Sequence, residues 1–397
     1  MRAMRDSGLE WLGEIPAEWS IIKGKHVFAL LQRPVRDSDG VITCFRDGEV
    51  TLRSNRRTEG FTVALKEIGY QGIEPGDLVV HGMDGFAGSI GISDSRGKAS
   101  PVLNVLDSTQ NKKFLMYYLR ALAYREVYLA LADGIRVRSC NLSWKKIGSL
   151  PIALPSPGEQ LRTVSYLDEK CAQVDRAIEA AEGSIEEILK YRSSCLEETF
   201  NRLDGTYSKV KLKYLLEESK EKSVDGIGEP LSITIASGVL RSSELEIPNP
   251  ASSLVGAKIV HAGDLVFNKL KAYFGVMYVS PYDGLISSEY AIYRALDPDA
   301  LSLKYIEYLV HTNQIIDEFI IRISGVADGF RRLYTSDLFN ISITLPPLRV
   351  QERAVRELNS LYDSVNASIA AKKSIIADLK AYKQSLIYEV VTGKRGV

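Results

Sequence analysis

The stretch VSYLDEKCAQVDRAIEAAEGSIEEI, residues 164–188, places apolar or small side chains alternately three and four residues apart. This spacing is the heptad seam of a coiled-coil helix. Adding 191 to each number gives a second seam within VRELNSLYDSVNASIAAKKSIIADL, residues 355–379, with Lys372 as its one polar position. The predicted seam residues are Val164, Leu167, Val174, Ile178, Ile185, Ile188, Val355, Leu358, Val365, Ile369, Ile376 and Leu379.

Each seam predicts a helix of about 40 residues, from near Glu159 to Phe200 and from near Gln351 to Val391, which is roughly 60 Å long. A helix of this length with one apolar stripe needs a partner. Residues 156–205 hold 6 basic and 11 acidic residues, a net charge of −5, and residues 346–397 hold 9 and 5, a net charge of +4. Opposite charge favours pairing of the two helices with each other, in an antiparallel arrangement. A coiled coil that joins two chains is the alternative.

Shorter matches extend the duplication beyond the helices. GDLVV at residues 76–80 recurs as GDLVF at residues 263–267, a shift of 187. IALP at residues 152–155, followed by Gln160, recurs as ITLP at residues 343–346, followed by Gln351, a shift of 191. The chain therefore divides into a first module (1–155), a central helix (156–205), a second module (206–345) and a C-terminal helix (346–397).

Both modules have the pattern of an α+β fold. Short runs rich in Val, Ile and Tyr, bounded by Gly, Pro, Asp and Ser, predict strands at residues 79–80, 89–92, 231–235 and 275–279. One helical segment follows in each module, at residues 113–132 and 303–324. The predicted architecture is two similar mixed α/β domains, each followed by a long helix, with pseudo-two-fold symmetry.

Composition excludes several classes of protein. A hydrophobic content of 45% and a charged content of 25% over 397 residues are typical of globular domains. No apolar run reaches the roughly 18 residues of a membrane span, and the first residues show no signal-peptide core. The four scattered cysteines fit a reducing cytoplasm. The net charge is zero, so a nucleic-acid partner would require a local basic patch.

Several polar clusters could form such a patch, because Arg, Lys and Asn read base edges while Tyr and Lys bind phosphates. Two clusters, around Arg136 and around Arg331, occupy corresponding places in the repeat. For each cluster, a solvated surface loop is the alternative interpretation. The candidate DNA-binding residues are Arg53, Asn55, Arg56, Arg57, Arg136, Arg138, Lys145, Asn268, Lys269, Lys271, Tyr273, Arg331, Arg332 and Tyr334.

Signatures of catalysis are absent from the sequence. There is no Asn/Asp-Pro-Pro-aromatic tetrapeptide of an amino-methyltransferase, no Walker loop and no dinucleotide-binding glycine pattern. The four histidines are isolated, which disfavours a metal site or a His-based triad. We therefore expect no catalytic residue, no metal and no cofactor in this chain.

The chain resembles the specificity subunit of type I restriction–modification systems over nearly its whole length. The resemblance rests on DSGLEWLGEIPAEW at residues 6–19, the Gly-Asp-Leu-Val strands, PYDG at residues 281–284, the Glu-Gln or Gln-Glu helix entries and the ending TGK at residues 392–394. It implies two target-recognition domains that read the halves of a split, asymmetric site in double-stranded DNA. It also implies two adenine methyltransferase subunits and translocating restriction subunits as partners, with S-adenosylmethionine, ATP and Mg bound by those partners.

Two other functions remain as hypotheses. A coiled-coil scaffold could join two ligand-binding domains without recognising DNA. A self-contained nuclease or methylase would need catalytic motifs that the sequence lacks.

Overall fold

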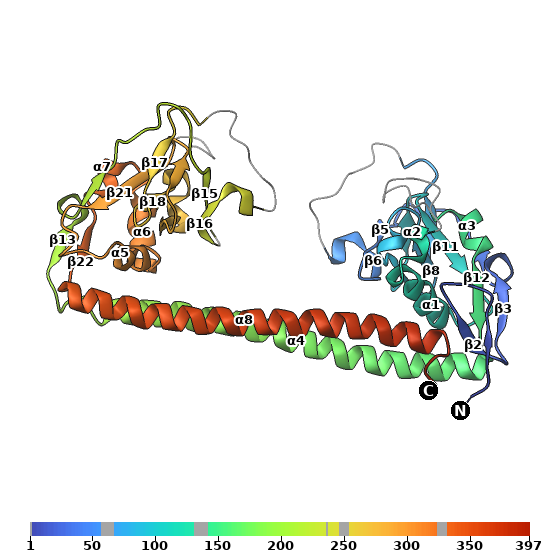
Figure 1. Ribbon diagram of the computed structural model, residues 1–397. Coiled ribbons are helices and arrows are strands. Elements are labelled where there is room, and N and C mark those ends of the chain that lie inside the picture. The colour runs from blue at the N-terminus through green and yellow to red at the C-terminus, as the bar shows by residue number, and fades with distance from the viewer. Residues whose placement is uncertain (1, 57–66, 131–141, 236, 246–253, 324–331) are drawn as a thin grey trace. The chain divides into compact units, whose positions relative to one another are not determined.

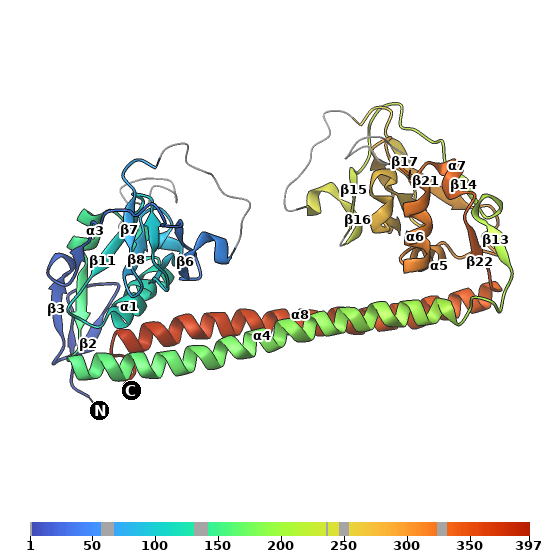
Figure 2. The same ribbon diagram turned by 180° about the vertical axis from the view of Figure 1, so that it is seen from behind.

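A computed structural model gives the fold, and it describes residues 2–56, 67–130, 142–235, 237–245, 254–323 and 332–397. The chain forms two compact units (Figures 1 and 2). Unit 1 comprises Met1–Glu182 together with Lys373–Val397, and unit 2 comprises Gly183–Lys372. Each unit therefore contains one module and parts of both long helices, a grouping that differs from the four consecutive segments expected from the sequence.

The two long helices are α4 (Pro157–Asn201) and α8 (Leu348–Val391). Both begin a few residues before the predicted starts. In α4 the first residue is proline, whose fixed φ angle and missing N–H suit the first turn of a helix. At the end of α8, the Thr392 hydroxyl donates to the Tyr388 carbonyl (2.6 Å), and Gly393 takes a φ of 72°, which ends the helix.

The helices run antiparallel within each unit. In unit 1 the first half of α4 lies beside the second half of α8, where Lys383 Nζ contacts both carboxylate oxygens of Asp175 at 2.7 Å. In unit 2 the second half of α4 lies beside the first half of α8, and the Arg192 guanidinium lies 5.0 Å from the Tyr362 ring. The predicted fold class is confirmed.

The seam side chains are turned away from solvent. Of the predicted seam residues of α4 and α8 in unit 1, Leu379 is half-buried and the other five are buried, namely Val164, Leu167, Val174, Ile178 and Ile376. In unit 2, Leu358 and Val365 are buried, and Ile185, Ile188, Val355 and Ile369 are half-buried. Lys372, the polar position of the pattern, is also half-buried.

The module of unit 1 is built from short antiparallel strands. Its main sheet has the order β4-β11-β8-β9, and strand β3 pairs with β12, which leads into α4. The strands are β1 (Met4–Asp6), β2 (Glu14–Pro16), β3 (Ser20–Lys23), β4 (Ala29–Leu30), β5 (Ile42–Cys44), β6 (Val50–Leu52), β7 (Gln71–Ile73), β8 (Leu78–His81), β9 (Ile90–Ile92), β10 (Gly97–Ala99), β11 (Leu103–Asp107) and β12 (Pro151–Leu154). The helices are η1 (Gly24–His26), η2 (Arg53–Asn55), η3 (Gly85–Ala87), α1 (Lys112–Tyr124), α2 (Val127–Ala130) and α3 (Trp144–Ser149).

The module of unit 2 repeats this plan. Its main sheet has the order β14-β21-β18-β19, and β13 pairs with β22, which leads into α8. The strands are β13 (Lys209–Lys211), β14 (Leu216–Glu218), β15 (Leu231–Thr234), β16 (Gly238–Arg241), β17 (Lys258–Val260), β18 (Leu265–Phe267), β19 (Met277–Val279), β20 (Gly284–Ile286), β21 (Ala291–Ala295) and β22 (Ser342–Thr344). The helices are η5 (Leu212–Tyr214), η6 (Ser242–Glu244), η7 (Lys269–Phe274), α5 (Leu303–Val310), α6 (Asn313–Arg322) and α7 (Thr335–Leu338).

Each predicted helical segment within a module is in fact two helices. In unit 1 the chain breaks between α1 and α2, where Glu126 takes a φ of 57°. In unit 2 it breaks between α5 and α6 at His311 and Thr312, and the Thr312 hydroxyl donates to the Leu309 carbonyl at 2.7 Å. The sequence has neither Gly nor Pro at these breaks, so tertiary packing overrides the local helical pattern.

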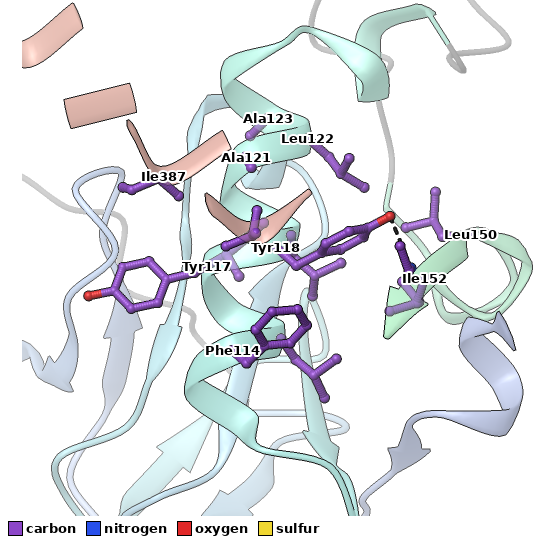
Figure 3. Packing of buried hydrophobic residues seen from close by; sticks show 14 of the residues in the cluster. Phe114, Tyr117, Tyr118, Ala121, Leu122, Ala123, Leu150, Ile152 and Ile387 are labelled. Carbon is purple, nitrogen blue, oxygen red and sulfur yellow. Dashed lines mark hydrogen bonds between the residues drawn. The ribbon is translucent and has the colours of Figure 1, made fainter. Parts of the chain in front are cut away.

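The core of unit 1 joins the sheet, α1 and the ends of both long helices. Figure 3 shows Tyr118 of α1 directed toward β12, where its hydroxyl donates to the Pro151 carbonyl at 3.1 Å. Ile387 of α8 packs into the same cluster, as does Leu167 of α4. In unit 2, Leu196 of α4 and Leu358 of α8 pack against the equivalent core. Each module therefore packs against the beginning of one long helix and the end of the other.

Candidate nucleic-acid interface

The repeated Gly-Asp pair has a structural role. In unit 1, Gly76 has a φ of 86° and the buried Asp77 carboxylate accepts from the Arg33 guanidinium and from the Glu74 N–H (2.8 Å). In unit 2, Gly263 has a φ of 98° and Asp264 binds Arg294 at 2.8 and 3.1 Å. The pair fixes the turn that leads into β8 and β18, and the candidate residues of the second module begin directly after β18.

Asn268, the residue after β18, caps the following helix. Its side-chain carbonyl accepts from the N–H groups of Leu270 (3.1 Å) and Lys271 (3.2 Å). Because Asn268 is only 9% exposed, its amide is largely used by the fold. In unit 1, His81 occupies the corresponding place, since 81 + 187 = 268. Its Nδ1 accepts from the N–H groups of Met83 (3.2 Å) and Asp84 (3.0 Å).

Accepting these two bonds requires a neutral His81, because a protonated ring has no acceptor nitrogen. Burial of the ring lowers the pKa of His81. The Arg46 cation also lowers it, while the Asp84 carboxylate raises it without reversing the net shift. The repeat in the sequence places His81 opposite Asn268, but it did not predict their common role, because histidine and asparagine share little except a side-chain acceptor atom.

Helix η7 presents an aromatic and basic face. Tyr273 and Phe274 are 38% and 49% exposed, and their rings lie 4.3 Å apart. Lys271 is exposed, with its ammonium 5.9 Å from the Phe274 ring. Among the residues that the structure describes, Lys271 forms no ion pair. Its counterpart region in unit 1 differs, because Phe86, which corresponds to Tyr273, packs partly buried against the core.

The start of α7 lies against the same loop. The Leu333 N–H donates to the Lys269 carbonyl at 3.1 Å, which places Arg332 and Tyr334 beside η7. Tyr334 is 51% exposed, whereas Arg332 is half-buried and pairs with Glu289 at 2.7 Å. The structure therefore brings Asn268, Lys269, Lys271, Tyr273, Arg332 and Tyr334 to one edge of unit 2. Arg331 lies outside the described residues.

Glu218 holds this edge together. Its carboxylate accepts from the Thr335 hydroxyl (2.6 Å) and from Lys258 (2.9 Å), and Lys269 lies 3.8 Å away. Burial opposes ionisation of Glu218, but the bonds from Thr335 and Lys258 outweigh it and lower the pKa. Lys269 is therefore partly neutralised by the protein itself.

Unit 1 has an equivalent edge. The Leu142 N–H donates to the Gly82 carbonyl at 2.7 Å, the counterpart of the bond between Leu333 and Lys269. This bond brings the start of α3 beside the loop after β8. Lys145 is exposed on α3. Arg136 and Arg138 lie outside the described residues.

The candidates near η2 are mostly used within unit 1. Arg53 Nε donates to the Thr43 hydroxyl (3.2 Å), and Asn55 Nδ2 donates to the Thr51 hydroxyl (2.9 Å). Arg56 pairs with Asp47 (2.6 Å) and Glu49 (3.0 Å), and its guanidinium lies 4.2 Å from the Phe45 ring. Arg57 lies outside the described residues. The structure thus favours Lys145, Lys271, Tyr273 and Tyr334 as the described candidates most available to a ligand.

Two further observations bear on the class of protein. Among the described residues, no group of three His, Cys, Asp or Glu side chains is placed to hold a metal ion. Of the helices described, none is both long and apolar enough to cross a membrane.

Comparison with known proteins defines the class of fold. No model of a known protein family matches the chain. One similar solved chain comes from a study of complex assembly and conformational transition of the type I R-M system, with a TM-score of 0.70 and 17% identity. The match covers 96% of this chain and 99% of that one.

A second similar structure is the HsdS subunit from Thermoanaerobacter tengcongensis, with a TM-score of 0.54 and 17% identity over 96% of this chain and 98% of that subunit. At such identities the comparison establishes the fold. The chain has the two-domain, paired-helix fold of type I restriction–modification S subunits, which confirms the resemblance noted from its sequence at the level of fold.

Proposed function

We propose that this chain is the DNA-specificity subunit of a type I restriction–modification complex. In this role it recognises a two-part, asymmetric DNA site and directs partner subunits to it. The observation that carries the proposal is the pair of equivalent edges, one formed around His81 and Lys145 in unit 1 and the other around Asn268 and Tyr334 in unit 2. The backbone frame is repeated there, while the exposed side chains differ.

This difference supports an asymmetric site. Direct readout depends on side chains that meet base edges, whereas phosphate contacts mainly fix position. Unit 2 exposes Lys271, Tyr273 and Tyr334 at its edge, whereas unit 1 exposes Lys145 at the start of α3. Two similar frames with different side chains suit two half-sites of different sequence.

The long helices suit a spacer function. A 45-residue helix such as α4 is about 67 Å long at 1.5 Å per residue. Since α4 and α8 both contribute to both units, the number of residues in them would determine the separation of the half-sites.

Catalysis would belong to the partners. The two expected adenine methyltransferase subunits would bind S-adenosylmethionine, and restriction subunits would use ATP and Mg. The chain itself would supply no catalytic group and would act in the cytoplasm. The isolated histidines and the missing methyltransferase tetrapeptide support this division.

Co-expression with a type I methyltransferase subunit, followed by methylome sequencing, tests the proposal. We expect adenine methylation within one bipartite motif with unequal halves. A methylome without such a motif, although the complex assembles, would instead support the alternative of a scaffold that joins two ligand-binding domains. Methylation by the purified chain alone would contradict its non-catalytic role.

A further inference from the structure

The two units differ where the beginning of one long helix meets the end of the other. In unit 1 a segment of the chain covers this junction. Residues 2–19 form a hairpin of β1 and β2 followed by a turn, in which Leu12, Ile15 and Trp19 are buried. The Arg2 guanidinium binds the Glu159 carboxylate at 2.6 and 2.9 Å, and Trp19 Nε1 donates to the same carboxylate at 3.2 Å.

The hairpin also covers the end of α8. The Tyr388 hydroxyl donates to the Trp11 carbonyl at 3.0 Å. At Gly393 a Cβ atom would lie 2.4 Å from the Pro16 ring, so only glycine permits this approach. Residues 2–19 thus touch both Glu159 at the helix beginning and Gly393 at the helix end.

Among the residues described in unit 2, no such segment covers the junction, and α4 leads directly into the module. The equivalent junction contains a pocket of about 300 Å³. The shift of 191 residues relates Glu159 to Val350 and Gly393 to Arg202, and both Val350 and Arg202 line the pocket. The pocket therefore corresponds to the surface that the hairpin occupies in unit 1.

The charged groups of the pocket are arranged differently from those of unit 1, with Arg202 at the place of Gly393. Val350 replaces the carboxylate that receives Arg2, and Arg353 lies one helical turn further on the same side of α8. Arg202 and Arg353 are exposed, and neither forms an ion pair within the part of the chain that the structure describes. Leu203, Tyr207, Val350 and Ala354 add apolar surface, and Glu357 is the one acidic lining residue.

We propose that this pocket is a docking site for an extended acidic segment of a partner protein. The segment would lie as residues 2–19 lie in unit 1, with a carboxylate at the place of Arg2 and a proline or aromatic ring at the place of Pro16 or Trp19. Charge complementarity to Arg202 and Arg353 specifies the acid, and the hairpin on the equivalent surface specifies the extended backbone and the ring. The proposal does not depend on DNA recognition.

A labelled peptide tests the proposal on the full-length chain. The probe is a fluorescein-labelled synthetic peptide of residues 2–19 carrying Arg2→Glu, with the unchanged peptide as its comparison. Fluorescence anisotropy should show at least tenfold tighter binding of the Arg2→Glu peptide. The chain variant Arg202→Glu with Arg353→Glu should reverse this preference.

The matched control is Arg162→Glu, since Arg162 is the exposed counterpart of Arg353 in unit 1. Binding of the Arg2→Glu peptide to this variant should be unchanged, and circular dichroism should show all variants folded. Equal affinity for the two peptides, no binding of either, or loss of binding in Arg162→Glu alone would each overturn the proposal. DNA binding measured on the same variants is separate, so failure of the docking site would leave the proposed function standing.

Discussion

Replacing Gln351 by alanine should loosen unit 2 where α8 begins. The Gln351 side chain is fully buried and makes three hydrogen bonds to backbone groups. Its Oε1 accepts from the Ser302 N–H (2.9 Å), and its Nε2 donates to the carbonyls of Ala300 (2.9 Å) and Pro346 (2.8 Å). These bonds tie the beginning of α8 to the beginning of α5.

The expected loss of stability follows from the number of backbone groups that would lose their hydrogen-bond partner. At about 1 kcal/mol for each hydrogen bond, Gln351→Ala should cost roughly 3 kcal/mol. The equivalent residue in unit 1, Gln160, bonds to only two backbone groups, the Asn111 N–H (3.0 Å) and the Pro155 carbonyl (3.0 Å). Its third partner is the Gln110 side chain, which can turn to water, so Gln160→Ala should cost roughly 2 kcal/mol.

Amide hydrogen exchange can measure both losses, because a chain with two units has no single free energy of unfolding. Exchange should accelerate at Ser302 in Gln351→Ala and at Asn111 in Gln160→Ala. Gln173→Ala is the control, since this exposed glutamine on α4 should change stability by less than about 0.5 kcal/mol. The reasoning fails if Gln351→Ala costs no more than the control, or less than Gln160→Ala.

Three further predictions concern pH, spacing and binding. Burial lowers the pKa of His311 to about 4, so the folded unit 2 binds fewer protons than the unfolded chain between pH 6.5 and 4. Stability from the neutral ring should be complete above pH 6.5 and decrease by about 3 kcal/mol as the pH falls to 4. Amide hydrogen exchange within unit 2 should show a flatter pH dependence of stability in His311→Phe, and an unchanged dependence would refute this. Inserting four residues after Ile185, with a matching insertion in α8, adds about 6 Å to the paired helices. The spacer of the methylated motif should then lengthen by about 2 base pairs, and continued methylation of the original spacing would exclude the spacer function. Lys271→Ala should weaken DNA binding by the complex and reduce the salt slope by about 1, as measured by fluorescence titration, whereas an exposed lysine distant in sequence from the candidate interface, Lys190, should give no change when replaced by alanine.

The long helices were predictable because their pattern is local. The three-and-four spacing repeats in register over 25 residues in both α4 and α8, and the seam residues are turned away from solvent in the structure. Only the helix beginnings were misplaced, by a few residues, since Pro157 and Leu348 carry no seam side chain.

Interactions between distant segments were not predictable. Asp77 and Asp264 occupy equivalent places in the repeat, yet Asp77 binds Arg33, which precedes it, and Asp264 binds Arg294, which follows it. Neither shift of the repeat relates these two arginines. The common role of His81 and Asn268 was hidden for a similar reason, since it lies in an acceptor atom and not in residue type. In contrast, Asp47 and Glu49 lie close to Arg56 in the sequence, so the ion pairs of Arg56 could have been predicted.

Unit 1 is assembled from the two extremes of the polypeptide. Leu386, Ile387, Val390 and Val391 complete the core that contains Leu12 and Ile15. These partners come from two separate segments, Met1–Glu182 and Lys373–Val397, whereas unit 2 is the single continuous segment Gly183–Lys372. Unit 1 therefore depends on residues that lie on both sides of unit 2 in the chain, while unit 2 is continuous in sequence. Loss of residues 386–391 would thus remove part of the core of unit 1 and leave the core of unit 2 intact.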